Sequence, residues 1–435
     1  MKRIAAFILA LTMAGSLVAC AGAEPPATQP SATQAPATEA TEAPSYAAEA
    51  VLPTGEPVEL TWSSWVMTDP AVLALYQKIA DAYNESNPYN ITVLITPPTE
   101  DYLTELLFAT ASGIGPDVAH IPAQWLPQLL QLGVVRCLNS YVSQAMLEDW
   151  FPGTREAVTV NSELMAIPWY AEAQALLVNA ELCSQAQVDP QAIASWEDLM
   201  TAAEKIAALD AAVYGLGIPS SGKEMGEGYH TLPAIRANGG EFLAEGEVLL
   251  ESDAAGQAYA DLQKLFLEAI TPEAASLRDL RELFAAGKLG FYWDTEAGGA
   301  ALPGSTQAMA LPGCGYVDTQ ILAVFDSCGD EKMAAAVHFM EYLSGPETIS
   351  LLRQGGHAVM SSRDSVQAAV FASCDSVTAA YVQAMSAARA LPVGHLRFRE
   401  MDGMLSEMLR ELAQGGDVAQ ILGKWDGQLQ EVYDD

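Results

Sequence analysis

Positive charge is scarce in this sequence. Its 435 residues include 20 lysines and arginines against 55 aspartates and glutamates, which gives a formal net charge of −35 at pH 7. Such a surface repels phosphate backbones and anionic lipid headgroups, so no nucleic-acid partner is expected and a polybasic membrane contact is excluded. An association with a membrane has to come from another feature of the chain.

Histidine and cysteine are also few. The five histidines are scattered and the six cysteines include no C-x-x-C pair, so neither a zinc site nor a thioredoxin-like motif is indicated. The motifs H-E-x-x-H and G-x-S-x-G are absent too, so the sequence lacks the catalytic residues typical of zinc and serine hydrolases. We therefore expect no metal and no cofactor. Cys314 and Cys328 could pair in an oxidising compartment, but buried free thiols are favoured.

The N-terminal segment has the pattern of an export signal. Lys2 and Arg3 precede an apolar stretch, which leads to Leu17-Val18-Ala19-Cys20. This ending resembles the bacterial lipoprotein lipobox, and a membrane-spanning helix would need about 20 apolar residues, more than the segment offers. We expect residues 1–19 to be a lipoprotein signal peptide and Cys20 to carry lipid. The protein would then be extracytoplasmic and anchored to the bacterial cell membrane.

The next segment, residues 20–57, is a linker built almost wholly from Ala, Pro, Thr, Glu, Gln and Ser. It lacks the apolar periodicity that a buried element needs, so we expect a disordered, partly polyproline-II spacer after the lipidated Cys20. At about 3 Å per extended residue it could hold a folded domain up to ~100 Å from the bilayer.

The remaining chain alternates between strand and helix patterns. A strand at 58–62, a helix at 69–84, a strand at 90–95 and a helix at 102–112 open it. This order predicts an α/β fold with a mostly parallel sheet and helices on its faces. Helical periodicity also occurs at 197–209, 254–269, 277–286, 331–343 and 401–414.

Short motifs recur along this region in a fixed order. They are Ser112 to Val118 (S-G-I-G-P-D-V), Gln131 to Leu138, Ala166 to Asn179, Ser195 to Leu199 (S-W-E-D-L), Asn238-Gly239-Gly240 and Phe284 to Lys288 (F-A-A-G-K). Together they resemble family 1 of the extracellular solute-binding proteins of ABC importers, which includes maltose- and other sugar-binding lipoproteins.

The resemblance implies a two-lobed periplasmic-binding-protein-like fold with the ligand cleft between the lobes. Residues 58–168 with 310–355 would form lobe 1, and residues 169–309 with 356–435 lobe 2. Such a protein is not an enzyme; it captures a small-molecule solute, here a sugar or oligosaccharide, and delivers it to ABC transporter permease subunits. We expect a monomer whose lobes close about crossings near Pro168 and Leu311-Pro312-Gly313.

A sugar site needs aromatic rings for the C–H faces of the solute and polar side chains for its hydroxyl groups. Ser64 and Trp65 follow the first strand, and Gln124 and Trp125 follow the strand at 118–121, where open α/β sheets place ligands. The resemblance adds Glu172 at the inter-lobe crossing, with Tyr170 beside it.

The second lobe contributes three further candidates. By resemblance, Tyr229 occupies the place of a stacking tyrosine, while Trp293 and Asp294 end a strand that should reach the cleft. For Trp65 and Trp125 the alternative is packing against a helix. Packing is the expected role of Trp62, Trp150, Trp196 and Trp425.

Two other functions stay open at this point. A glycoside-processing enzyme could use Glu172 and Asp294 as its pair of carboxyl groups. A rigid surface binding module would instead expose an apolar patch.

Overall fold

The computed structural model describes residues 46–47, 49, 51–99, 101–299, 305–313 and 315–434. The expected signal peptide, Cys20, most of the expected spacer and Cys314 lie outside the described residues. Cys328 is buried and free. In the described part of the chain, no helix is both long and apolar enough to cross a membrane.

A ten-stranded sheet runs through the described chain in the order β2-β1-β3-β12-β6-β10-β7, with β11 and β13 also paired to β6 and β14 to β12. Its strands are β1 (Val58–Ser64), β2 (Ile91–Ile95), β3 (Val118–Pro122), β6 (Ile167–Asn179), β7 (Tyr214–Leu216), β10 (Leu289–Thr295), β11 (Thr306–Met309), β12 (Tyr316–Val324), β13 (Met360–Ser361) and β14 (Arg389–Ala390). Two hairpins lie apart from it: β4 (Thr159–Val160) with β5 (Glu163–Leu164), and β8 (Leu243–Ala244) with β9 (Glu247–Val248).

The helices cover this sheet. They are α1 (Pro70–Ser86), α2 (Tyr102–Ala111), α3 (Leu126–Gln131), α4 (Gln144–Asp149), α5 (Pro152–Glu156), α6 (Ala180–Gln185), α7 (Trp196–Ala207), α8 (Leu232–Ala237), α9 (Asp253–Leu267), α10 (Leu277–Ala285), α11 (Met333–Leu343), α12 (Pro346–Gln354), α13 (Asp364–Val370), α14 (Ser376–Ala387), α15 (Phe398–Ala413) and α16 (Val418–Asp434). Short 3-10 turns are η1 (Trp65–Thr68), η2 (Ala123–Trp125), η3 (Pro190–Ala192), η4 (Tyr229–Thr231), η5 (Ala297–Gly299) and η6 (Asp326–Cys328).

The helices predicted from periodicity are all present, with ends that differ by a few residues. Helix α7 illustrates why. Ser195 and Asp198 form a capping box that satisfies the first amide groups, and Leu199, Ala203 and Ile206 recur at helical spacing on the buried face. Local capping and periodicity therefore agree with the tertiary packing.

The sheet is mixed, whereas we expected mostly parallel strands. Strand β1 is parallel to both β2 and β3, as predicted, but β12 is antiparallel to β3 and to β6, and β10 is antiparallel to β6. The reason is topological: β12 returns from a long excursion of the chain and inserts between β3 and β6 in the opposite direction.

Two hydrophobic clusters define two lobes. The first lobe comprises β1–β5, α1–α5 and α11–α13, and its cluster includes the buried Trp62 and Trp150. The second lobe comprises α6–α9, β7–β9, α15 and α16, and its cluster includes Trp196 and Trp425. Helix α10 and strand β10 lie between the clusters, since Phe284 and Tyr292 belong to the first and Trp293 to the second. These four tryptophans are core residues, as predicted.

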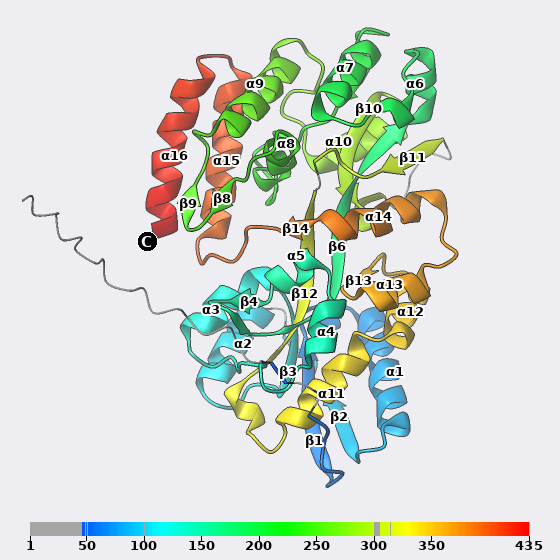
Figure 1. Ribbon diagram of the computed structural model, residues 1–435, viewed down its shortest axis with the longest axis vertical. Coiled ribbons are helices and arrows are strands. Elements are labelled where there is room, and N and C mark those ends of the chain that lie inside the picture. The colour runs from blue at the N-terminus through cyan, green and yellow to red at the C-terminus, as the bar shows by residue number, and fades with distance from the viewer. Residues whose placement is uncertain are drawn as a thin grey trace, which may run out of the picture. The chain divides into compact units, whose positions relative to one another are not determined.

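Strands β6, β12 and β14 pass between the lobes (Figure 1). Strand β6 contributes Ile167 to the first cluster and Val178 to the second. The chain returns to β12 through Gly313, whose positive φ of 78° and close approach to Ala237 leave no room for a Cβ atom.

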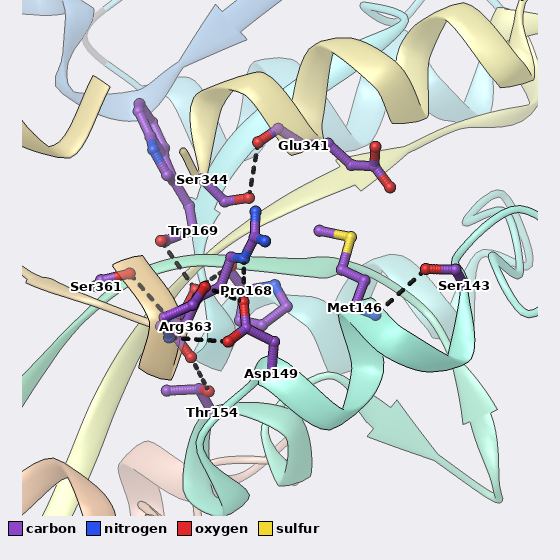
Figure 2. A network of polar contacts seen from close by, with 12 residues as sticks. Ser143, Met146, Asp149, Thr154, Pro168, Trp169, Glu341, Ser344, Ser361 and Arg363 are labelled. Carbon is purple, nitrogen blue, oxygen red and sulfur yellow. Dashed lines mark hydrogen bonds and ion pairs between the residues drawn. The ribbon is translucent and has the colours of Figure 1, made fainter. Parts of the chain in front are cut away.

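The lobes divide the C-terminal region later than we expected. We expect residues from 356 onward in the second lobe, but Val366 and Phe371 pack in the first cluster. Figure 2 shows one cause: Arg363 Nε donates to Asp149 of α4 at 2.8 Å in the first lobe. Helix α14, which follows, packs against β6 and β11 between the two lobes.

The spacer also ends earlier than expected. Ala47 forms a parallel bridge with Ser143, and its amide donates to Asn139 O at 3.2 Å. Tyr46 packs against the first cluster. Ordered structure therefore precedes Val58, because these two residues add backbone and apolar contacts that composition does not indicate.

Candidate functional site

Trp65 is the most exposed aromatic candidate in the first lobe. It begins η1 directly after β1, and 37% of its surface is exposed. Its indole Nε1 donates to Gln320 Oε1 of β12 at 3.1 Å, and its ring meets that of Trp125 edge to face at 6.1 Å. The ring is thus held in place while part of it stays open to a ligand.

Trp125 packs between two other rings. Its ring lies 6.1 Å from Trp65 and 6.2 Å from Tyr102, and its buried indole Nε1 has no hydrogen-bond partner. Gln124 is half-buried on the same turn, η2. We call Trp65, Gln124, Trp125 and Gln320 the first-lobe wall.

Ser64 lies behind this wall. Its side chain is fully buried, its Oγ is 2.7 Å from His120 Nδ1, and it accepts from Val66 N at 3.4 Å. Burial lowers the pKa of His120 to about 3, so this ring is neutral. Ser64, expected at the ligand, therefore supports the turn that carries Trp65.

Strands β6 and β12 place polar side chains on one face. In their register Glu172 opposes Asp318 and Tyr170 opposes Gln320, while Ala171 alternates to the other face. Tyr170 is 8% exposed and Glu172 is half-buried. We call Tyr170, Glu172 and Asp318 the polar floor.

The two carboxyl groups of the polar floor resist ionisation. Burial, and then the nearby Asp318, raise the pKa of Glu172 to about 7. Burial raises the pKa of Asp318 to about 6. Near neutral pH Glu172 is therefore partly protonated, so the polar floor can both donate to and accept from hydroxyl groups.

The second-lobe candidates are packed in the core instead of lining a cavity. Trp293 is fully buried, its Nε1 donates to His230 O at 3.0 Å, and its ring stacks on that of His230 at 5.2 Å. Tyr229 is 3% exposed and its hydroxyl donates to Phe398 O at 3.0 Å. Neither ring offers a free face, because the alternation of β10 and the α15 contact turn both inward.

Asp294 has a structural partner as well. It is 2% exposed and accepts from Arg281 Nε at 2.7 Å and Nη2 at 3.0 Å. A carboxylate held by this bidentate ion pair is not available as the acid or base of a glycosidase. The structure therefore does not bring Tyr229, Trp293 and Asp294 together with the first-lobe wall as free ligand groups.

A cavity of about 640 Å³ lies between the lobes. The first lobe lines it with Ala123 of η2, with Leu126 of α3 and with residues of α5 and β4. The second lobe lines it with β8 and with Tyr433 of α16, and β14 with the following loop closes one side. Small-molecule sites have volumes of about 300–1,000 Å³. We call this space the inter-lobe cavity.

The wall and the polar floor adjoin the inter-lobe cavity through their neighbours in the chain, although their own side chains are not part of its lining. Tyr316 lines the cavity and lies on the same face of β12 as Asp318 and Gln320, because side chains two residues apart share a face. Ala123 and Leu126 flank Gln124 and Trp125 in the chain.

An ion-pair chain crosses the cavity margin. Arg389 of β14 donates to Glu156 of α5 at 2.6 and 2.8 Å and lies 4.0 Å from Glu241, which also pairs with Arg236 of α8. Burial alone would raise the pKa of Glu156, but the hydrogen bonds from Arg389 hold it below its usual range. These charges are compensated within the protein.

Several residues of the site escaped the sequence reasoning. All of them lie late in the chain. Strands β12 and β14 carry Asp318, Gln320 and Arg389, whereas His395 and Tyr433 line the cavity from the loop after β14 and from α16. One signal was present, because Asp318 and Gln320 are polar residues at alternate positions of an otherwise apolar strand. In the ranges that the structure describes, no cluster of His, Cys, Asp or Glu could hold a metal ion.

A family comparison bears on the fold. A family profile described as bacterial extracellular solute-binding protein matches residues 78–379, which is more than half of the chain. The chain therefore belongs to the bacterial extracellular solute-binding proteins, a family of binding proteins rather than enzymes.

Individual relatives are distant. The chain is 24% identical over 220 residues to a binding protein of Brucella abortus, a match covering 49% of this chain and 53% of the relative, so it spans about half the length of that protein. It is 26% identical over 121 residues to the maltotriose-binding protein of Pyrococcus abyssi, covering 28% of this chain and 26% of the relative.

Solved structures match over most of the chain. The cyclic alpha-maltosyl-1,6-maltose binding protein from Arthrobacter globiformis gives a TM-score of 0.74 at 18% identity, covering 87% of this chain and 99% of that one. The sugar-binding protein MalE from Xanthomonas citri gives 0.74 at 18% identity, covering 86% and 97%. At these identities the likeness establishes the two-lobed fold.

Proposed function

We propose that this protein captures a neutral carbohydrate between its two lobes and delivers it to an ABC importer. The observation that carries the proposal is the exposed, hydrogen-bonded Trp65 beside the polar floor of Tyr170, Glu172 and Asp318. An open indole face suits the C–H face of a sugar, and partly protonated carboxyl groups suit its hydroxyl groups.

The charge balance supports an uncharged solute. The chain has 35 more acidic than basic residues, and the polar floor holds two carboxyl groups. A phosphorylated or carboxylated solute would meet repulsion there. Relatives named for maltotriose and for arabinooligosaccharide agree with a neutral saccharide.

Permease subunits of an ABC transporter are the proposed protein partners. The binding protein itself would act as a monomer, since each inter-lobe site is complete within one chain. We further propose that a lipid on Cys20 tethers it to the cell membrane, on the basis of the Leu17-Val18-Ala19-Cys20 sequence.

A thermal-shift screen of neutral mono- and oligosaccharides, followed by calorimetry, tests the binding function. A sugar at 100 times its dissociation constant should stabilise the protein by about 2.7 kcal/mol. Trp65→Ala should weaken its binding roughly tenfold or more by removing one stacking ring. Phe108→Ala, at a site 73% exposed on α2, is the matched control and should bind normally. No stabilisation by any sugar would refute the proposal.

Cell fractionation tests the anchor. Cys20→Ala should leave an unprocessed precursor or release the protein from membranes. A variant that matures and fractionates like the wild type would show that the tether is not a lipid on Cys20.

A further inference from the structure

The second-lobe end of the inter-lobe cavity holds a pair of stacked rings. His395 and Tyr433 both line the cavity, with ring centroids 4.8 Å apart and planes inclined by 28°. The two come from distant parts of the chain, the loop after β14 and the last turn of α16 (Figure 1). Both are half-buried, so each keeps some surface for a ligand.

The ring pair of His395 and Tyr433 is fixed by a hydrogen bond and carries no charge. Arg397 N donates to His395 Nδ1 at 3.2 Å, which leaves the ring proton on Nε2. Burial and the adjacent Arg397 lower the pKa of His395 below its usual value. A neutral, fixed ring pair suits stacking rather than ion binding.

The first lobe supplies an apolar surface to the same cavity. Leu126 and Leu130 of α3 line it from the first lobe, and Leu391 of the loop that follows β14, which packs against the second cluster, adds to the apolar lining. Rings on one lobe and aliphatic side chains on the other together form a lining for the C–H faces of a second sugar unit.

Charges at this end select against anions. Glu156, Glu241 and Glu245 line the cavity against a single arginine, Arg389, which is already paired with Glu156. The guanidinium group is therefore not free to bind an anion, and the surplus carboxylates accept hydrogen bonds from hydroxyl groups.

From these observations we infer a distal subsite at His395 and Tyr433, which takes a further unit of a neutral oligosaccharide. The solute would extend from the first-lobe wall, past Tyr316, to this ring pair. The inference rests on the proposed function. It adds that the second-lobe end of the cavity makes the affinity depend on the number of sugar units in the solute.

Calorimetry with neutral oligosaccharides of increasing length, from glucose to maltohexaose and the corresponding arabinose series, tests the subsite. Tyr433→Ala should weaken binding of the longest bound members roughly tenfold and change that of the shortest by less than about twofold. Tyr89→Ala is the matched control, because Tyr89 is a half-buried tyrosine packed on His338 at 4.9 Å in the first lobe. It should leave both affinities unchanged.

A second variant guards against an effect on folding. Leu391→Trp fills the cavity without removing the ring pair and should cause the same length-dependent loss, with the melting temperature as a check. Equal losses for short and long sugars, or none in both variants, would overturn the subsite while leaving the proposed function intact. Absence of binding by every sugar in wild-type protein would overturn both.

Discussion

Two carboxyl groups, those of Glu172 and Asp318, lie on directly opposed residues of β6 and β12. The folded protein holds the Glu172 proton more tightly than the unfolded chain does, because burial raises its pKa to about 7. Stability associated with this group is therefore complete below the usual glutamate pKa and is lost as the pH rises through about 7.

Glu172→Gln should abolish the loss of stability that occurs as the pH rises through about 7. We expect the variant to exceed the wild type in unfolding free energy by about 2 kcal/mol at pH 8 and to match it near pH 4.5. Denaturant unfolding across this pH range measures the difference, with Glu59→Gln, at an exposed position of β1, as the control. A difference that does not vary between pH 4.5 and 8 would contradict the assigned burial.

Truncation should cost much more stability at Trp293 than at Trp65. Trp293→Ala removes a fully buried ring from the second cluster and should cost about 3–5 kcal/mol of stability. Trp65→Ala removes a partly exposed ring and should cost less than about 1 kcal/mol. Urea unfolding compares the two. Similar losses of stability would contradict the assignment of Trp293 as buried and Trp65 as partly exposed.

The same two residues show what sequence reasoning could reach. A tryptophan directly after a strand was correctly expected to lie at a strand end, because the end is visible in the local pattern. Which face of β10 carries Trp293 depends on its packing against Trp196 of α7 and His230 of η4, far away in the chain, so its burial could not be predicted.

Among the elements, α4 and α13 are joined by one aspartate. Asp149 accepts from Arg363 Nε, from Ser365 N and from Ser365 Oγ at 2.7–2.8 Å. These bonds lower its pKa against the opposing effect of burial. The stability that they provide is present above the usual aspartate pKa and is lost as the pH falls through the lowered value.

Asp149→Ala should therefore destabilise the protein by about 2–4 kcal/mol at neutral pH and by less below pH 3. In the Asp149→Ala variant, hydrogen exchange of backbone amides should be faster in α13 than in α9. The exposed Glu204, paired with Lys264, gives a control, since Glu204→Ala should cost under about 1 kcal/mol. Equal effects of the two changes would contradict the role of Asp149 in holding α13 to the first lobe.

Helices were predictable element by element, but strand order was not. Capping residues and apolar spacing lie within each helix, as in α7. The place of β12 between β3 and β6 arises from contacts between residues far apart in the chain, which no local pattern encodes. The late lobe boundary has the same origin, since it depends on the Asp149 contact.

For the whole molecule, strands β6, β12 and β14 are the links that must accommodate any movement between the lobes. Few links of this kind permit rigid-body closure about a bound solute. Small-angle X-ray scattering should show a smaller radius of gyration when the protein is saturated with its sugar. An unchanged radius under demonstrated saturation would indicate a rigid binding module.

The central claim is that a neutral sugar binds between the lobes. A crystal structure with the tightest-binding saccharide of the screen tests it most directly. We predict a sugar ring against Trp65, hydroxyl groups within hydrogen-bond distance of Gln320 and the Glu172–Asp318 pair, and both lobes in contact with the ligand. A saccharide bound elsewhere on the protein, or contacting one lobe alone, would contradict the account.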